Sequence, residues 1–220
     1  MLVIFDWDGT LIDSAGKIVG CMRQAAVDAG VAPRDEASIR DIIGLGLDEA
    51  LLRLYPDQPD AVREAIRRHY STRFVAADQT PCDFFPGVRA VLDSLRRSEL
   101  VLAVATGKSR RGLDRVLGNL GMNEFFHGSR CADETASKPD PLMLRELCEE
   151  FDVAPRDAVL VGDTEYDLEM ARRIAMPSVG VSYGVHGPER LRRWHPLAIL
   201  DEFSGLLPLL AARYGMAIPR

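Results

Sequence analysis

The sequence predicts an α/β fold, in which a Rossmann-like parallel sheet core carries a small α-helical domain as an insert. Short apolar runs recur along the chain, and each of them stops abruptly at polar residues. After the insert these runs alternate with segments of helical periodicity, a pattern that predicts βαβ units and a parallel sheet. Residues 15–81 show helical periodicity without a convincing strand, which predicts the helical insert.

The first strand is predicted at residues 2–5, Leu-Val-Ile-Phe, which lead directly into Asp6-Trp7-Asp8-Gly9-Thr10. A short buried strand of a parallel sheet delivers the residues that follow it to the carboxyl edge, where ligands bind in open α/β sheets. Because side chains alternate along a strand, we expect Asp6 and Asp8 to share one side and Trp7 to face the other.

The insert is predicted to form a domain of its own at residues 15–81, with the core at residues 1–14 and 82–220. Apolar residues recur at helical spacing before Gly30 and again from Val62 to Phe74. The stretches from Asp13 to Gly16 and from Pro81 to Gly87 are the expected hinges, and the second of them is rich in proline.

The remaining strands are predicted at residues 101–105, 158–161, 179–181 and 198–200. Helices are predicted around residues 113–120, which Gly121 closes, and around residues 144–151. A last helix is expected at residues 206–214. These elements place Thr106 and Asp163 directly after strands, at the same edge as Asp6.

Composition excludes several classes of partner. The net charge is -6 and the pI is near 5.3, so the chain has no basic footprint for nucleic acid. No apolar run is long enough to cross a bilayer. The four cysteines show no C-x-x-C spacing and the first residues lack a signal peptide, so we expect a cytoplasmic protein. The sequence carries no indication of an oligomeric state.

Four motifs occur in order along most of the chain: Asp6-x-Asp8-Gly9-Thr10, Thr106-Gly107, Lys138-Pro139 and Gly162-Asp163-Thr164-x-x-Asp167. This ordered set resembles the haloacid dehalogenase-like hydrolase superfamily, in particular its phosphoglycolate phosphatase and β-phosphoglucomutase branch. The resemblance implies a helical cap domain inserted after the first motif. Trp7 departs from the smaller apolar residue usual in that family, which affects packing behind the strand and leaves the two acids unchanged.

The four acids Asp6, Asp8, Asp163 and Asp167 are expected to converge at the sheet edge. At an effective dielectric constant of about 20, two such charges about 4 Å apart repel by about 4 kcal/mol, so the cluster calls for a cation. Ligands that are all oxygen, without His or Cys, favour Mg²⁺. The resemblance makes Asp163 and the backbone carbonyl of Asp8 metal ligands beside Asp6.

Asp6 is the predicted nucleophile, because a carboxylate with an ordinary pKa of about 3.9 is ionised at neutral pH and can form an aspartyl-phosphate. Asp8 is expected to protonate the leaving alcohol and then to deprotonate the attacking water. Both assignments agree with the roles that the resemblance implies.

The other motifs are expected to hold the phosphoryl group. Thr106, Gly107 and Lys108 would bind it by a hydroxyl and by backbone N–H groups near a helix start, with Lys108 either adding charge or only solvated. Lys138 would neutralise both Asp6 and the phosphoryl oxygens. Asp167 is expected to support the site by positioning Lys138 or a metal-bound water.

The insert is expected to act as a lid that excludes water and supplies substrate contacts. Its Gly44-Leu45-Gly46-Leu47 turn either reaches the substrate or is a plain turn between helices, and Arg40 is a candidate contact for a substrate anion. Five arginine pairs are interpreted as solvated helix faces: Arg67-Arg68, Arg96-Arg97, Arg110-Arg111, Arg172-Arg173 and Arg192-Arg193.

The resulting hypothesis is a Mg²⁺-dependent phosphatase that hydrolyses a small phosphorylated metabolite and resembles phosphoglycolate phosphatase. Two alternatives stay open. One is a sugar phosphomutase of the β-phosphoglucomutase type, which uses the same motifs. The other is a phosphate-binding regulatory protein without activity, against which the complete set of acids, Thr106 and Lys138 speaks.

Overall fold

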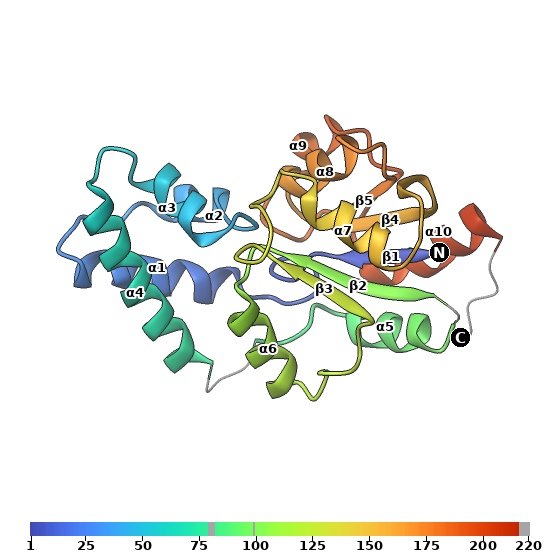
Figure 1. The fold of residues 1–220 in the computed structure, drawn as a ribbon, viewed down its shortest axis with the longest axis horizontal. Coiled ribbons are helices and arrows are strands. Elements are labelled where there is room, and N and C mark those ends of the chain that lie inside the picture. Colours follow the sequence, from blue (N-terminus) through green and yellow to red (C-terminus); the bar gives the residue numbers. More distant parts are fainter. Residues whose placement is uncertain (79–81, 99, 216–220) are drawn as a thin grey trace.

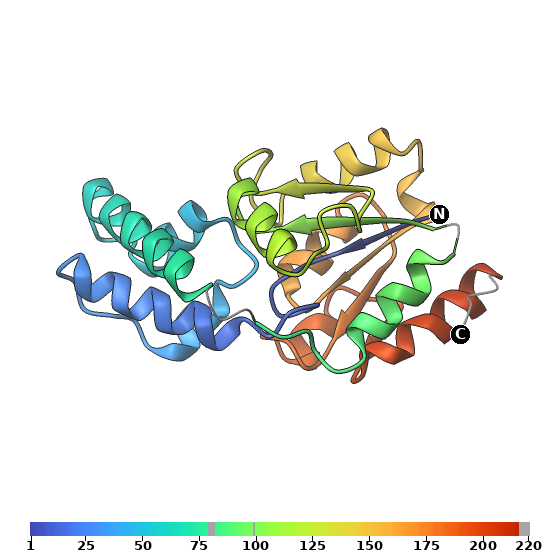
Figure 2. The ribbon, with the colours of Figure 1, turned by 90° about the horizontal axis from the view of Figure 1, so that it is seen from below.

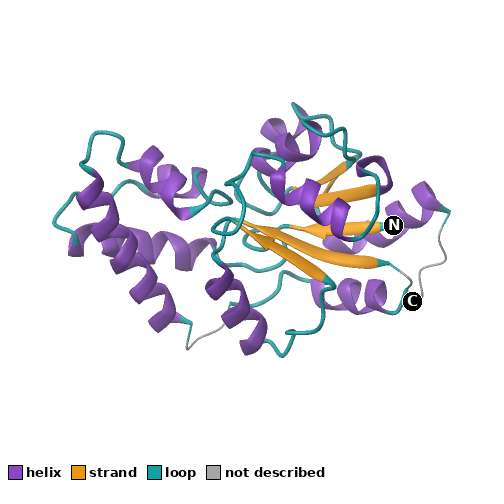
Figure 3. Cartoon of the chain, viewed as in Figure 1, coloured by secondary structure: helices purple, strands orange, loops and turns teal. Residues whose placement is uncertain are grey.

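The computed structural model describes residues 1–78, 82–98 and 100–215. Figure 1 shows two parts, a core built around a sheet and a purely helical cap at one end of it. The secondary structure in Figure 3 separates them clearly, because every strand lies in the core. The predicted α/β fold with a helical insert is therefore confirmed.

Six parallel strands form the sheet in the order β3-β2-β1-β4-β5-β6. Their bounds are β1 Leu2–Phe5, β2 Val101–Thr106, β3 Gly128–Cys131, β4 Ala158–Gly162, β5 Ser178–Val181 and β6 Ala198–Leu200. In the register of the sheet, Leu2 of the central strand pairs with Val101 of β2 and with Ala158 of β4. The strand order reverses between β1 and β4, and such a point opens a crevice at the carboxyl ends.

Helices cover both faces of the sheet, as Figure 2 shows. The core helices are α5 Val88–Arg96, α6 Arg110–Asn119, α7 Leu142–Glu150, α8 Glu165–Arg172, α9 Pro188–Arg192 and α10 Leu206–Tyr214. Phe5 and Trp7 are buried together on the face that α5 and α10 cover, whereas Leu2 and Ile4 face α7 and α8. Trp7 therefore packs into the core on the face covered by α5 and α10, as expected from the alternation of side chains along a strand.

The cap consists of α1 Ala15–Asp28, α2 Glu36–Asp41, α3 Leu47–Leu54 and α4 Asp60–Ala77. It has a core of its own, in which Met22 of α1, Leu51 of α3 and Ile66 of α4 are buried together. The division into residues 1–14 with 82–220 and residues 15–81 stays a prediction. Its second boundary and Pro81 of the expected hinge lie at residues 79–81, outside the described residues.

One strand was missed by the sequence interpretation. β3 reads Gly-Ser-Arg-Cys and is only partly buried, because it forms the edge of the sheet beside β2. An edge strand that is half solvated needs no apolar run, so hydrophobic patterning does not detect it. In the described part of the chain, no helix is both long and apolar enough to span a membrane.

The central sheet should carry much of the stability of the core. Leu160 in β4 is fully buried, whereas the Leu52 side chain in α3 is 48 % exposed. We expect Leu160→Ala to lower the free energy of unfolding by about 2–5 kcal/mol, because it leaves a cavity in the core. The same substitution at Leu52 should change it by less than about 0.5 kcal/mol. Urea unfolding of the two variants measures both values, and equal losses would contradict this assignment.

Candidate active site

The predicted site residues meet at the carboxyl ends of three neighbouring strands. Asp6 follows β1, Thr106 is the last residue of β2, and Asp163 follows β4. The backbone N–H of Asp6 donates to the Val161 carbonyl over 2.9 Å, which extends the sheet pairing up to the acid. These residues lie at the crevice where the strand order reverses.

A buried ammonium joins two carboxylates at the centre of the site. Lys138 Nζ donates to Asp6 Oδ1 and to Asp167 Oδ1, each over 2.6 Å. All three side chains are at most 1 % exposed. The other oxygen of Asp167 accepts from the N–H and the hydroxyl of Thr164, in a capping box that begins α8. The expected contact of Asp167 with Lys138 is thus present.

Burial dominates the electrostatics of this cluster. It raises the pKa of Asp6 well above its usual range, against the opposing charge of Lys138 and with the help of Asp167 and Asp163. Burial alone would lower the pKa of Lys138, yet Asp167 and Asp6 raise it above its ordinary value. An ordinary pKa was expected for Asp6 from the sequence. The structure corrects this, so an ionised Asp6 depends on positive charge nearby.

Asp163 is held rigidly by both of its oxygens. The Thr10 hydroxyl donates to Oδ1 over 2.8 Å and the Val185 N–H donates to Oδ2 over 2.9 Å. A Cβ at Gly9, where φ is +86°, would stand 2.3 Å from this carboxylate, and one at Gly184 would stand 2.2 Å from the Asp163 Cβ. Glycine is therefore required at both positions so that two loops can enclose the acid.

The acids form a cluster that suits a hard cation. Carboxylate oxygens of Asp6, Asp163 and Asp167 lie within 4.8 Å of one another. Asp6 Oδ2 is buried and has no hydrogen-bond partner among the described residues. A donor set of oxygens with one unsatisfied carboxylate oxygen fits Mg²⁺, the ion that the sequence predicts. Asp6 and Asp163 would hold it.

The carboxylate of Asp8 lies outside this cluster, which corrects the expectation that all four acids converge. Its Oδ1 accepts from the Ser14 hydroxyl over 2.6 Å, and its Oδ2 pairs with Lys108 Nζ at 2.9 Å. The same ammonium lies 4.7 Å from the centre of the Phe74 ring on α4. Lys108 was expected to be either a phosphate ligand or solvated, and its contact with Asp8 was missed.

Thr106 and Gly107 lie against the cap. Thr106 is buried and its Oγ1 accepts from the Lys108 N–H over 3.2 Å. A Cβ at Gly107 would stand 2.5 Å from the Leu45 carbonyl oxygen and 2.6 Å from that of Gly44. The Gly46 N–H donates to Ser137 Oγ over 2.8 Å. The glycine-containing turn of the cap therefore reaches the core beside the site.

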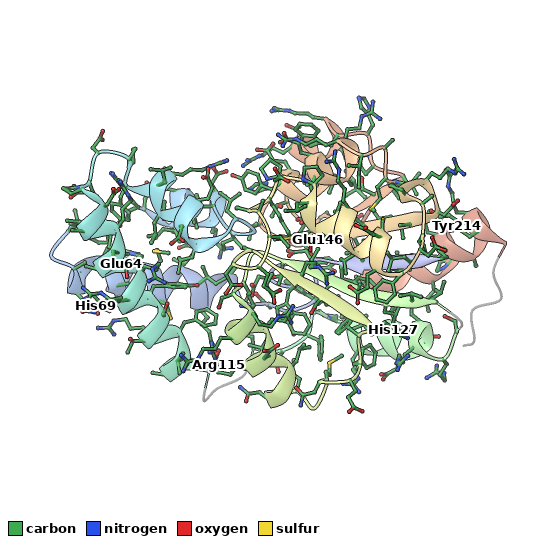
Figure 4. The ribbon with its side chains drawn as sticks, viewed as in Figure 1. Glu64, His69, Arg115, His127, Glu146 and Tyr214 are labelled. Carbon is green, nitrogen blue, oxygen red and sulfur yellow. The ribbon has the colours of Figure 1, made fainter. Side chains whose placement is uncertain are left out.

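Side chains near the two hinges also join cap and core. Asp78, after the end of α4, pairs with Lys17 at 3.0 Å and with Arg115 at 2.6 Å. Figure 4 labels Arg115 on α6, on the side toward the cap. On the other side, Asp41 of the cap pairs with Arg190 of α9. The pairs of Asp78 with Arg115 and of Asp41 with Arg190 join the cap to the core, whereas the pair with Lys17 lies within the cap.

A cavity of about 790 Å³ lies between cap and core and includes Asp6 and Asp8 in its wall. Arg67 and Arg111, which were interpreted as solvated, both line it. Arg111 is exposed and the Arg67 side chain is 43 % exposed, so both reach solvent as expected, and only their place on the cavity was missed. Arg40 does not line it, and its guanidinium pairs with Glu36 at 2.8 Å. Position along a helix does not reveal which face another domain covers, so the sequence does not show which arginines line the cavity.

Comparisons with known proteins agree with these features. A family model described as haloacid dehalogenase-like hydrolase matches residues 3–181. The sequence is 34% identical to "Probable phosphatase IndB" of Dickeya dadantii, over 92% of this chain and 90% of that protein. It is 33% identical to a plasmid-encoded phosphoglycolate phosphatase of Cupriavidus necator, over 94% and 92%. A solved hydrolase from Pseudomonas syringae shares the fold, with a TM-score of 0.87 and 24% identity over 97% of this chain and 98% of that one.

The buried acids should make the metal-free protein less stable as the pH rises. Burial and the charge of Asp167 raise the pKa of Asp163 to about 7, whereas its ordinary value is 3.8. Between about pH 4 and about pH 7 the folded chain keeps a proton that the unfolded chain has lost, so the free energy of unfolding falls with rising pH, by up to about 1.4 kcal/mol per unit.

Urea unfolding across this pH range, with chelator and with saturating Mg²⁺, measures the effect. We expect Mg²⁺ to remove this contribution, because the bound cation displaces the proton. Asp163→Asn should remove it without metal. An unchanged pH dependence in that variant would show that Asp163 is not the group responsible.

Proposed function

Because the chain belongs to the haloacid dehalogenase-like hydrolase family, we propose that it is a Mg²⁺-dependent phosphatase, which hydrolyses a small phosphomonoester through an aspartyl-phosphate. The observation that carries this proposal is the buried group of Asp6, Lys138 and Asp167. Lys138 holds one oxygen of Asp6, and the other oxygen of Asp6 has no hydrogen-bond partner among the described residues. A carboxylate fixed in this way is suited to attack phosphorus.

In the first step of the proposed reaction, Asp6 forms a bond to phosphorus and the bond from phosphorus to the substrate alcohol breaks. Asp8 gives the departing alcohol its proton. The Ser14 hydroxyl and the Lys108 ammonium contact both oxygens of Asp8 and so fix the position of its carboxylate in the cavity wall. In the second step Asp8 takes a proton from water, and the resulting hydroxide releases phosphate from Asp6.

The phosphoryl group is proposed to bind between Lys138, Thr106 and the backbone of Gly107 and Lys108. Lys138 would balance charge that develops on the phosphoryl oxygens. Mg²⁺ at Asp6 and Asp163, with the proposed help of the Asp8 carbonyl, supplies further positive charge when it is bound. The turn of the cap at Gly44 and Leu45 packs against Gly107, and this contact supports the exclusion of bulk water from the phosphoryl site.

The substrate is proposed to be a small phosphorylated metabolite of the cytoplasm. The names of several relatives, among them the phosphoglycolate phosphatase of Cupriavidus necator, support a phosphomonoester. All four cysteines are free, which agrees with a reducing compartment.

Phosphate release tests the proposal directly. The panel contains 2-phosphoglycolate, sugar phosphates and nucleotides, each with Mg²⁺ and with chelator. Asp6→Asn should lower release by roughly 10³-fold or more, because it removes the nucleophile. Asp13→Asn changes an exposed aspartate of the same segment and should leave release unchanged. Release that persists in Asp6→Asn, or that needs no Mg²⁺, would contradict the mechanism.

A further inference from the structure

The cavity above Asp6 and Asp8 is large compared with a substrate such as a phosphorylated two-carbon acid. Its volume of about 790 Å³ lies in the upper part of the range of roughly 300–1,000 Å³ that accommodates drug-sized ligands. A phosphorylated two-carbon acid would fill only a small part of it. The space that remains must hold either water or the alcohol part of a larger substrate.

Helix α4 shows how far the cavity extends from the reacting groups. Phe74, Tyr70 and Arg67 of this helix all line it. Phe74 marks the reacting end, because its ring lies 4.7 Å from the ammonium that pairs with Asp8. Seven residues of helix separate Phe74 from Arg67, a distance of about 10 Å along the axis. The cavity therefore continues for about two helical turns beyond the site of the chemistry.

The cap side of this cavity is mainly apolar. Its wall includes Ile18, Met22, Ile43, Leu45, Tyr70 and Phe74. Tyr70 packs on Phe74 with ring centres 5.5 Å apart. Such a surface gains most by contact with an apolar or aromatic group.

Most cationic side chains of the cavity wall are already paired with acids of the protein, so few of them are available to bind a second anionic group of the substrate. Lys108 pairs with Asp8, Arg115 with Asp78, and Arg67 makes two bonds of 2.7 Å to Glu64. Among the cationic side chains of the described wall residues, only Arg111 has no ion pair, and it is exposed. Besides Asp6 and Asp8, the wall contains three further acids, Asp48, Glu49 and Asp133. A carboxylate on the substrate would meet no built site here.

We infer that the substrate of this site is a phosphomonoester whose alcohol part is bulky and largely apolar, rather than a phosphorylated two-carbon acid. The inference rests on the proposed phosphatase function. The phosphoryl group would lie at Asp6 and Lys138, and the alcohol would extend past Phe74 and Tyr70 toward Arg67. The apolar wall would then stabilise the bound alcohol and the transition state.

Three alkyl esters test the inference: 2-phenylethyl phosphate, ethyl phosphate and 2-phosphoglycolate. All three release a primary alcohol, so their main difference lies in what the cavity contacts. We expect kcat/KM for 2-phenylethyl phosphate to exceed that of each of the other two by at least about tenfold, from burial of the phenyl group. Equal or higher values for 2-phosphoglycolate would overturn the inference and leave the phosphatase function standing.

A pair of tryptophan variants locates the effect in the cavity. Ser71 and Ala76 are both exposed on α4, but only Ser71 lines the cavity. Ser71→Trp should lower kcat/KM for 2-phenylethyl phosphate by at least about tenfold and for ethyl phosphate by less than about threefold, because the indole occupies the space of the phenyl group. Ala76→Trp should alter neither value. Equal losses on both esters in Ser71→Trp would overturn the inference.

A binding measurement separates this inference from the proposed function. Titration calorimetry with Mg²⁺ compares 2-phenylethylphosphonate with ethylphosphonate, two analogues that cannot be hydrolysed. We expect binding of the first to be at least about tenfold tighter. If no ester is hydrolysed but this preference holds, the phosphatase function is wrong and the assignment of the cavity stands. Equal affinities would overturn the assignment whatever the enzyme hydrolyses.

Discussion

The buried ammonium of Lys138 is the interaction on which the rest of the site depends. It contacts carboxylates from two different motifs, Asp6 after β1 and Asp167 in α8, without access to water. Removing one partner of such a group leaves a buried charge unpaired, which typically costs about 3–5 kcal/mol. Asp167 in turn caps α8 through Thr164. The sheet edge, the start of α8 and the loop that carries Lys138 are therefore fixed relative to one another by one charge.

This one ammonium does not balance the acids around it. Asp6, Asp163 and Asp167 share the cluster with a single lysine, and burial raises the pKa values of Asp6 and Asp163. The folded site therefore holds more carboxylates than positive charges. At neutral pH a bound cation stabilises this arrangement better than protonation of the acids does. Gly9 and Gly184 enclose Asp163 so closely that the acid cannot move away to relieve this charge. The rigidity of these loops is what makes the site receptive to Mg²⁺.

The features of the structure that could be predicted are those that depend on short stretches of sequence. The apolar runs before Asp6 and Asp163 gave correct strands because buried parallel strands are continuously apolar. β3 was missed because an edge strand can be polar. The pair of Lys108 with Asp8 joins residues a hundred positions apart, and no periodicity signals such a contact. Which arginines line the cavity depends on how the cap lies on the core, which follows from tertiary packing alone.

The proposed reaction assigns chemistry and specificity to different parts of the chain. In the proposed reaction, Asp6, Asp8 and Lys138 at the carboxyl edge of the sheet would touch only the phosphoryl group and the oxygen that leaves. Every ester presents these atoms alike, so these three residues would not distinguish one alcohol from another. Discrimination must come from α4 and the turn at Gly44 and Leu45, which form the outer wall. On the proposed mechanism, contacts there would contribute to catalysis only while the cap lies on the core, so the ion pairs between cap and core would connect recognition of the alcohol with transfer of the phosphoryl group.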